Sequence, residues 1–371
     1  MTVEFFKYIE KIMKNTNQAI MNPESCILNP VLPPEWAPQS GIMLTWPHQH
    51  GIWVNLVKQA DITFTEIAKQ IALRQLLLIS YYDVTHKQHI VKLFEQAQVN
   101  FANIKLVEAK SNDIWVRDHG PITVIENNQP KVLDFSFNAW GGKYKFEHDD
   151  ALIKAIAKQG VFGKTPVESI NFVLEGGGIE VDGKGTMLTT ESVLLTNTRN
   201  HTTREEVEKH FKQWFGIERT LWLTRGHLQG DDTDGHIDTL ARFVDAETIC
   251  YVSCSNPDDE HYEPLMAMYE ELKSFKNYAG KPYKLIALPL PVAQFSPRGE
   301  RLPATYANFL MLNKAVLLPI YGDKENDIIA QDVLRACFPN HEIVPINCRT
   351  LINFYGSLHC ATMQLPVGVL S

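Results

Sequence analysis

Cysteine is scarce in this sequence, and the cysteines are not spaced as a CxxC pair or a disulfide framework. The 371 residues include six cysteines, with no CxxC pair and no dense framework. The six are Cys26, Cys250, Cys254, Cys337, Cys348 and Cys360. Such usage is typical of proteins in a reducing compartment, and it excludes a small fold held together by disulfides.

Long apolar runs and clusters of basic residues are also missing. No apolar stretch approaches the roughly 20 residues that cross a bilayer, and the N-terminal MTVEFFKYIEKIMKN lacks the apolar core of a signal peptide. No run of lysine or arginine could follow a phosphate backbone, and the formal net charge is −8. We therefore expect a cytoplasmic protein with no membrane or nucleic-acid partner, whose electric field favours small cations.

The apolar residues that are present predict the fold class. They recur at helical spacing over about 54–73, 86–98, 149–159, 203–215, 260–275 and 325–337, and a short apolar strand follows each helix. Further β-rich pieces separate these pairs, at a spacing of about 55 to 65 residues. The pattern predicts an α/β fold built from a repeated unit of about three strands and a helix. We expect residues 1–30 to be a helical extension and residues 31–371 to form one domain.

The stretch GDDTDGHID, residues 230–238, places four acids and a histidine in nine positions. If it continues into the strand suggested by IDTLARFV, then Asp234, His236 and Asp238 face the same way and can hold a cation. A calcium loop is excluded, because Gly235 at its sixth position would put Ala241 at the twelfth, where glutamate is needed. A solvated acidic turn with an incidental histidine is the alternative.

A second acidic stretch, SNDIWVRDHGP, surrounds Trp115 with Asp113, Arg117 and Asp118. A tryptophan beside carboxylates is a favourable place for an organic cation. In the simpler interpretation, Arg117 pairs with an aspartate next to a turn.

Glu175 ends an apolar strand and is followed by three glycines, which allow a close approach of the backbone. No GxxxxGK or helix-opening GxGxxG is present, and the following IEVDGKGTMLTT is typical of a hairpin, so a nucleotide loop is not favoured. The position makes Glu175 a candidate acid, base or ligand.

Cys360 lies in YGSLHCATMQLP, where it alternates with Leu358 and Thr362 on one face of an expected strand. Most cysteines in such positions fill the core. The glycine, serine and histidine upstream also allow exposure at a strand end, where Cys360 could act as a nucleophile.

Together these patches resemble the agmatine deiminase family, which includes the bacterial peptidyl-arginine deiminases. The resemblance runs from PPEWAPQSGIMLTWP to HCATMQ through SNDIWVRDHGP, NAWGGK, LEGGGIEVDGKG, GDDTDGHID and RLPATYANFLMLNK. It implies a five-bladed α/β propeller of ββαβ units around a central active site.

The resemblance also implies roles for particular residues. Cys360 matches the nucleophile, His236 and Glu175 the acid/base pair, and Asp118 and Asp238 the carboxylates that bind a guanidinium. Trp115 matches the aromatic neighbour of the substrate. Two carboxylates suit this role because a guanidinium stays protonated and offers its N–H groups in a fixed fork. The thiol chemistry needs no metal and no cofactor.

The expected activity is hydrolysis of agmatine at a carbon–nitrogen bond of its amidine group, with peptidyl arginine or another guanidine as the alternative substrate. Asp232 stands where the family often has a glutamate that receives the distal amine, and Tyr355 to His359 replace a glycine-rich run before the cysteine.

Two other functions explain part of the pattern. A zinc or manganese hydrolase would use His227, Asp232, His236 and Asp238. A polyamine-binding protein would need only the acids and the tryptophan. The sequence does not specify whether the chain forms a homo-oligomer.

Overall fold

A computed structural model describes residues 30–370. The predicted helical extension, residues 1–30, lies outside the described residues apart from Pro30. None of the helices in residues 30–370 combines the length and the apolarity that a membrane span requires.

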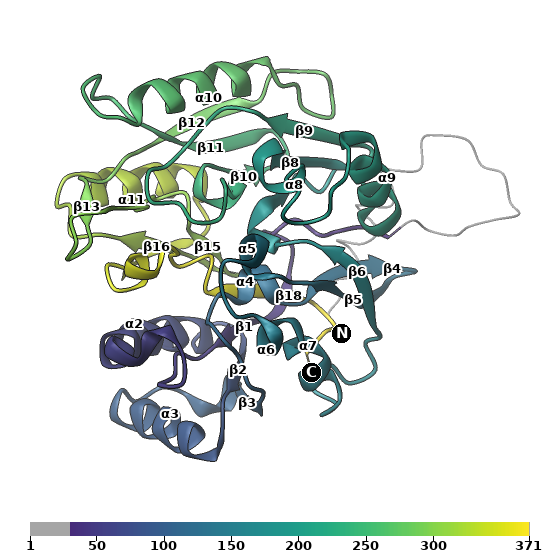
Figure 1. The fold of residues 1–371 in the computed structure, drawn as a ribbon, viewed down its shortest axis with the longest axis vertical. Helices are drawn as coiled ribbons and strands as arrows, with labels where there is room; N and C mark the ends of the chain where they lie inside the picture. Colours follow the sequence, from purple (N-terminus) through teal and green to yellow (C-terminus); the bar gives the residue numbers. More distant parts are fainter. Residues whose placement is uncertain (1–29, 371) are drawn as a thin grey trace, which may run out of the picture.

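The described chain is a mixed α/β fold with several small sheets (Figure 1). The strands are β1 (Gln39–Thr45), β2 (Leu76–Tyr81), β3 (Ile104–Glu108), β4 (Ile122–Glu126), β5 (Gln129–Ser136), β6 (Val167–Val173), β7 (Ile179–Val181), β8 (Thr186–Thr190), β9 (Arg219–Leu223), β10 (Ala241–Asp245), β11 (Thr248–Ser253), β12 (Lys284–Pro289), β13 (Gln294–Phe295), β14 (Arg301–Leu302), β15 (Leu310–Met311), β16 (Ala315–Ile320), β17 (Glu342–Asn347) and β18 (Thr362–Pro366).

One strand pattern recurs through the sheets. The orders β4-β5-β6, β7-β8-β9, β10-β11-β12 and β15-β16-β17 each combine one antiparallel and one parallel pair. The sheet β18-β1-β2-β3 begins with the same two kinds of pair, because β18 is antiparallel and β2 parallel to β1. The pairing of β18 with β1 sets Leu44 opposite Thr362, which anchors the cysteine-containing segment to the first strand.

The helices connect these strands. They are α2 (Val57–Ala72), α3 (Val84–Gln96), α4 (Val116–His119), α5 (Ala139–Gly142), α6 (Glu147–Asp150), α7 (Leu152–Ala157), α8 (Glu191–Leu194), α9 (Arg204–Phe215), α10 (Tyr262–Ser274) and α11 (Asn326–Cys337), with 3-10 turns η1 (Ile52–Asn55), η2 (Phe101–Asn103), η3 (Gly176–Gly178), η4 (Ile237–Thr239) and η5 (Leu351–Phe354). The longer helices lie on the outside of the molecule, and the sheets lie further in (Figure 1).

Local sequence explains where these helices begin and end, as α9 shows. Thr203 and Glu206 form a capping box that satisfies free N–H groups of the first turn. Gly216 ends the helix in the left-handed region at φ 66°, where a Cβ would meet the Pro30 carbonyl oxygen at 2.2 Å. Val207, Phe211 and Phe215 are buried, so the helix packs through one apolar face.

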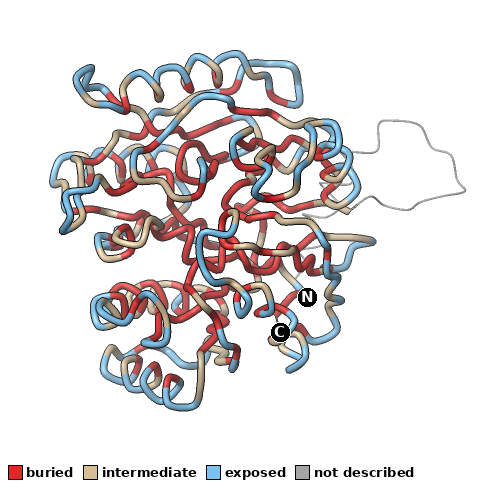
Figure 2. The backbone as a smooth tube through the Cα atoms, viewed as in Figure 1, coloured by how far each residue is buried: buried red, intermediate tan, exposed pale blue. Residues whose placement is uncertain are grey.

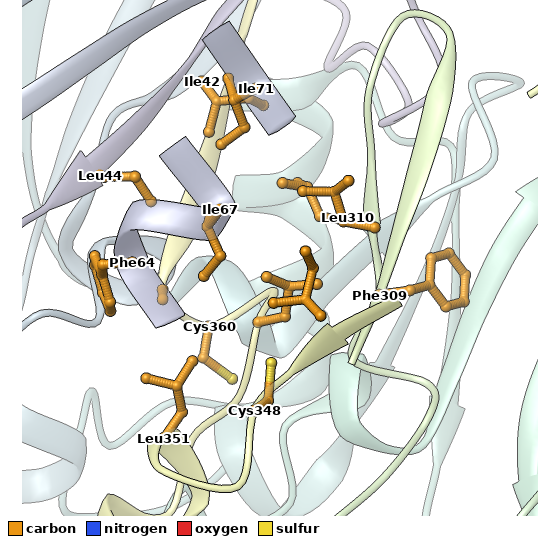
Figure 3. Close-up of a cluster of buried hydrophobic side chains, with 14 of the residues drawn as sticks. Ile42, Leu44, Phe64, Ile67, Ile71, Phe309, Leu310, Cys348, Leu351 and Cys360 are labelled. Carbon is orange, nitrogen blue, oxygen red and sulfur yellow. The ribbon is translucent and has the colours of Figure 1, made fainter. Parts of the chain in front are cut away.

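Burial is greatest toward the middle of the molecule, and the outer helix faces are exposed (Figure 2). The apolar core forms three clusters, and the first joins α2 and β1 to the segment around β15, β16 and Cys360. Figure 3 shows Cys360 with Cys348 and Leu351 in this cluster. The core therefore holds the backbone on which the predicted nucleophile is carried.

The predicted helices at 54–73, 203–215, 260–275 and 325–337 are confirmed as α2, α9, α10 and α11. The predicted helix at 149–159 is instead divided into two short helices. The helix α6 ends at Asp150, α7 begins at Leu152, and Ala151 lies between them.

Two predicted strands begin later than expected, as β10 at Ala241 and β18 at Thr362. Residues 234–238 turn rather than extend, because Asp234 and Gly235 have φ of 68° and 99° and the Asp231 carboxylate accepts the Gly235 N–H at 2.6 Å. Cys360 lies in a turn before β18, where Thr362 Oγ1 donates to the His359 carbonyl at 3.0 Å.

Candidate active site

Cys360 lines a pocket of about 570 Å³ and is itself buried. The pocket wall also carries two residues predicted from SNDIWVRDHGP, Trp115 and Asp118, and the predicted tail residue Asp232. The other lining residues are Ile52, Asn55, Leu56, Asp113, Trp140, Tyr144, Thr233, Ser296, Pro297, Arg298, Glu300, Asn353, Phe354, Tyr355 and Gly356. The turn before β18 thus presents a thiol to a space that a small molecule could enter.

Asp118 lies on the single turn of α4, and both of its oxygens are bound. Trp140 Nε1 donates to Oδ2 and the Gly177 N–H donates to Oδ1, both at 3.0 Å. Burial raises the pKa of Asp118 to about 6 against the lowering effect of His236, and the charges of Asp238 and Glu175 add to the rise. A buried carboxylate in this state is stabilised by a bound cation.

Asp238 follows His236 on η4 and is fully buried. His359 Nδ1 lies 2.7 Å from Oδ2, whereas Oδ1 has no hydrogen-bond partner in the part of the chain that the structure describes. Burial favours the neutral acid, but His359 and His236 outweigh it and lower the pKa of Asp238. The aspartate therefore keeps one charged, unpaired oxygen, and leaving such an atom without a partner is costly.

The Cys360 thiol lies 3.8 Å from Asp238 Oδ2 and 3.4 Å from Asn308 Oδ1. Burial raises the pKa of Cys360 well above its usual value, and the charges of Asp238 and Asp118 raise it further. A cation bound between these carboxylates would remove that repulsion, so the site favours the thiolate when such a cation is present.

His236 and Glu175, the two residues predicted as the acid/base pair, are in direct contact. His236 Nε2 lies 2.9 Å from Glu175 Oε2, and Nδ1 lies 3.5 Å from Asp118 Oδ1 without a hydrogen bond. Burial opposes the imidazolium, but Asp118 and Glu175 outweigh it and raise the pKa of His236 to about 9. Arg199 Nε donates to both Glu175 oxygens, at 2.8 and 3.0 Å, which orients the carboxylate.

The glycine run after Glu175 gives the site its space. A Cβ on Gly177 would lie 2.5 Å from His236 Nδ1, 2.8 Å from Asp118 Oδ1 and 3.2 Å from Asp238 Oδ2. Three predicted site residues from two separate stretches of the chain therefore converge on one glycine. No side chain could stand there without moving them.

The two residues predicted for the substrate tail differ in their surroundings. Trp115 lies against Gly356, whose added Cβ would come within 2.4 Å of the ring. Asp232 accepts a hydrogen bond from Tyr144 at 2.6 Å and lies 3.4 Å from Lys143 Nζ, so its charge is already partly matched. Asp234 turns away from His236 and Asp238, because it pairs with Lys143 and Arg199 at 3.0 and 2.8 Å.

Several residues that contact this site were not predicted from the sequence. Asn308 accepts the N–H groups of His359 and Cys360 through its side-chain oxygen, at 2.9 and 3.3 Å. Arg199, Trp140 and Glu35 lie within TNTRN, NAWGGK and PPEWAPQ, but no spacing rule indicated a partner for them. The sequence did offer a reason to expect His359 near the site, since it directly precedes Cys360.

The ligand set expected for a metal hydrolase is not brought together. His227 is exposed, while His236 and Asp238 are buried and engaged by Glu175 and His359. Across residues 30–370 no group of three or more His, Cys, Asp or Glu side chains is arranged to hold a metal ion. His236 and Asp238 instead lie with Asp118 around Gly177, and Asp238 lies 3.8 Å from the Cys360 thiol.

A profile of the Porphyromonas-type peptidyl-arginine deiminase family matches residues 31–366. The agmatine deiminase of Ectopseudomonas mendocina is 31% identical over 359 residues, covering 90% of this chain and 95% of the relative. The structure of a cysteine-to-serine variant of the C. jejuni agmatine deiminase with substrate bound is 36% identical, has a TM-score of 0.81, and covers 91% of this chain and 96% of its own. A Porphyromonas gingivalis structure provisionally named an arginine deiminase is 41% identical, with a TM-score of 0.85 and coverage of 92% and 100%. The predicted resemblance is confirmed: this chain belongs to the Porphyromonas-type peptidyl-arginine deiminase family.

Proposed function

We propose that this protein is an agmatine deiminase, which hydrolyses agmatine to N-carbamoylputrescine and ammonia. The observation that carries the proposal is the convergence of Asp118, Asp238 and His236 on Gly177, beside the Cys360 thiol. A planar cation fits between two carboxylates, and an imidazole fits a proton transfer at its edge. The agmatine deiminases named among the relatives support the substrate.

In the first half-reaction, Asp118 and Asp238 hold the guanidinium with its carbon above Cys360 Sγ. The substrate charge offsets the two carboxylates that raise the thiol pKa, so Cys360 gives its proton to water and attacks as thiolate. The thiol regains a proton from water after the product has left. A sulfur–carbon bond forms, His236 gives its proton to one nitrogen, and the carbon–nitrogen bond breaks. Ammonia leaves, and a thiouronium cation remains on Cys360.

In the second half-reaction, neutral His236 accepts a proton from water, and the hydroxide adds to the thiouronium carbon. The carbon–sulfur bond breaks, the thiolate returns, and the urea group of the product forms as one proton leaves. Overall one water is consumed. The proton released from the urea group ends on ammonia, which therefore leaves the reaction as ammonium. Glu175, fixed by Arg199, keeps His236 oriented through both steps.

The distal ammonium of agmatine would lie in the outer part of the pocket, past Trp115. Asp113 and Asp232 both line the pocket. No ion pair joins Asp113 to a basic side chain within residues 30–370, and burial raises its pKa to about 6, whereas Asp232 lies near Lys143. Acidic walls favour an ammonium tail over a carboxylate tail.

The proposal is tested by comparing kcat/KM for agmatine, free arginine, a peptidyl arginine and butylguanidine. We expect agmatine to exceed an internal peptidyl arginine, which offers no ammonium to the acidic wall, and to exceed free arginine by at least ~100-fold, since a carboxylate closed into an acidic pocket costs several kcal/mol. Butylguanidine, with no tail charge, should fall between them. Equal or better turnover of an arginine substrate would contradict agmatine as the substrate, and no turnover of any guanidine would contradict deiminase activity.

The pH dependence of kcat/KM for agmatine should be bell-shaped. As pH falls, Asp118 gains a proton near pH 6 and loses its attraction for the guanidinium. As pH rises, His236 loses its proton near pH 9 and can no longer protonate the leaving nitrogen. Initial rates of ammonia release across this range are the measurement, and a profile without an alkaline limb would argue against His236 as the acid.

We also propose that the repeated sheets form the five blades of a pseudo-symmetric α/β propeller, and that residues 31–371 act as one catalytic domain. The shared strand order supports the blades. The scattered cysteines support a cytoplasmic location.

A further inference from the structure

A buried chain of charged groups extends from Asp238 away from the substrate pocket. His359 Nδ1 lies 2.7 Å from Asp238 Oδ2, and His359 Nε2 lies 2.6 Å from Glu35 Oε2. Arg242 donates to the same Glu35 oxygen at 2.7 Å and also pairs with Glu180. All five residues are buried. One imidazole therefore bridges a carboxylate of the site and a carboxylate that does not line the pocket.

These contacts constrain the protons on His359. A neutral imidazole has only one N–H, so it cannot donate to two ionised carboxylates at once. Glu35 is ionised because Arg242 and the Met311 N–H, at 2.7 Å each, both donate to it. Asp238 faces the site as a carboxylate. With both acids charged, His359 makes both contacts only as the imidazolium, and Glu35 is the group that stabilises that form.

The same turn fixes the thiol and the carboxylate. The N–H groups of His359 and Cys360 both donate to Asn308 Oδ1. With Oδ2 of Asp238 bound to His359, its other oxygen is left unpaired. A rotation of the His359 ring would therefore release Asp238, which lies 3.8 Å from Cys360 Sγ.

We infer that Glu35 and His359 are positioning residues of this enzyme, which hold Asp238 ionised and aimed so that its free oxygen meets the guanidinium. The inference rests on the proposed function. Glu35 touches neither the pocket nor Cys360, and it acts only through His359.

Several charged groups surround this pair and set its titration. Those that face His359 are Glu35 before β1, Arg117 on α4, Arg242 on β10 and Asp238 on η4. Those that face Asp238 are His359, His236, Arg117, Arg242, Asp118 and Cys360. Burial and the charges of Arg117 and Arg242 outweigh Glu35 and Asp238 and lower the pKa of His359, so the imidazolium that both contacts require is held only by these two carboxylates. Among residues 30–370, only Glu35 and Asp238 bond directly to the His359 ring, so the charge of this imidazole depends on Glu35.

The test compares Glu35→Gln with Glu180→Gln, which removes a charge from the same network without touching His359. The glutamine amide in Glu35→Gln keeps the shape of the side chain but no longer stabilises the imidazolium, so Asp238 loses its charged partner and the pKa of Asp238 rises. We expect kcat/KM for agmatine at neutral pH to fall about 10- to 100-fold. The acidic limb should move to higher pH, because a second carboxylate then titrates there. Glu180→Gln should keep the position of that limb.

A second variant separates positioning from folding. His359→Asn keeps an N–H donor for Asp238 but cannot reach Glu35, so the acidic limb should move as in Glu35→Gln. Adding Glu35→Gln to His359→Asn should then change kcat/KM little further, because the two residues act as a unit. Additive losses of kcat/KM in the double variant would overturn this inference. An acidic limb that stays in place in both Glu35→Gln and His359→Asn would also overturn it. Either result would leave the proposed function standing. A wild-type protein that turns over no guanidine would overturn the proposed function and this inference with it.

Discussion

Replacing Cys360 with alanine is expected to abolish agmatine turnover, with a loss in kcat on the order of 10⁴-fold or more. Alanine offers no nucleophile to the guanidinium carbon, and no other thiol in residues 30–370 lines the pocket. Replacing Cys360 with serine should restore little activity, because Asp118 and Asp238 disfavour a further negative charge at this position. Ammonia release under saturating agmatine is the measurement.

Cys348→Ala is the matched control. Cys348 is buried in the same cluster, and burial raises its pKa to about 12, but it does not line the pocket. It should therefore retain activity close to wild type. If Cys360→Ala kept more than a tenth of the wild-type kcat, the thiol mechanism would be wrong.

The same chemistry predicts a trapped intermediate. Protein quenched in acid during turnover should carry a thiouronium adduct on the peptide that contains Cys360, and Cys360→Ala should carry none. A metal hydrolase or a polyamine-binding protein would give no adduct in either sample. This measurement separates the three functions that the sequence alone allowed.

The sequence was a good guide wherever local pattern decides the structure. The apolar periodicity of α2, α9, α10 and α11 predicts these helices because each packs one face against a sheet. It failed at residues 234–238, where side-chain to backbone hydrogen bonds from Asp231 impose a turn on a segment that alternates like a strand. Alternation alone cannot distinguish these two outcomes.

The site was predicted to the extent that chemistry is concentrated in short motifs. Cys360, His236, Glu175, Asp118 and Asp238 were each visible as an unusual residue in an unusual stretch, and the fold brings them together. Glu35 was not visible in this way, because 324 positions separate it from His359. A single acid beside a tryptophan gives no indication of a partner at the other end of the chain. The contact becomes visible only in the fold, where the pairing of β1 with β18 brings the two ends of the chain together.

Replacing Asp118 or Asp238 with asparagine should disable the enzyme to a similar degree. Asparagine keeps the size of each side chain but turns an amide toward a guanidinium that needs charge. Removing one partner of a buried, hydrogen-bonded ion pair costs on the order of 3–5 kcal/mol. We therefore expect kcat/KM for agmatine to fall by at least about 100-fold, since each 1.4 kcal/mol is about tenfold. A variant within tenfold of wild type would remove that aspartate from the site.

The two variants should differ in stability, and this difference tests the electrostatics independently of turnover. The folded-state pKa of Asp118 is raised, so its charge opposes folding at neutral pH, and Asp118→Asn should keep or increase the melting temperature. The folded-state pKa of Asp238 is lowered, so its charge stabilises the fold above its unfolded pKa, and that contribution is lost as pH falls through the lower folded value. Asp238→Asn should therefore lower the melting temperature at pH 7, because His359 loses its carboxylate partner. Thermal unfolding of both variants at pH 7 is the measurement, and a larger loss for Asp118→Asn than for Asp238→Asn would contradict the assigned charges. The substrate explains why a destabilising charge is kept at Asp118, since the bound guanidinium supplies the cation that the folded protein lacks there.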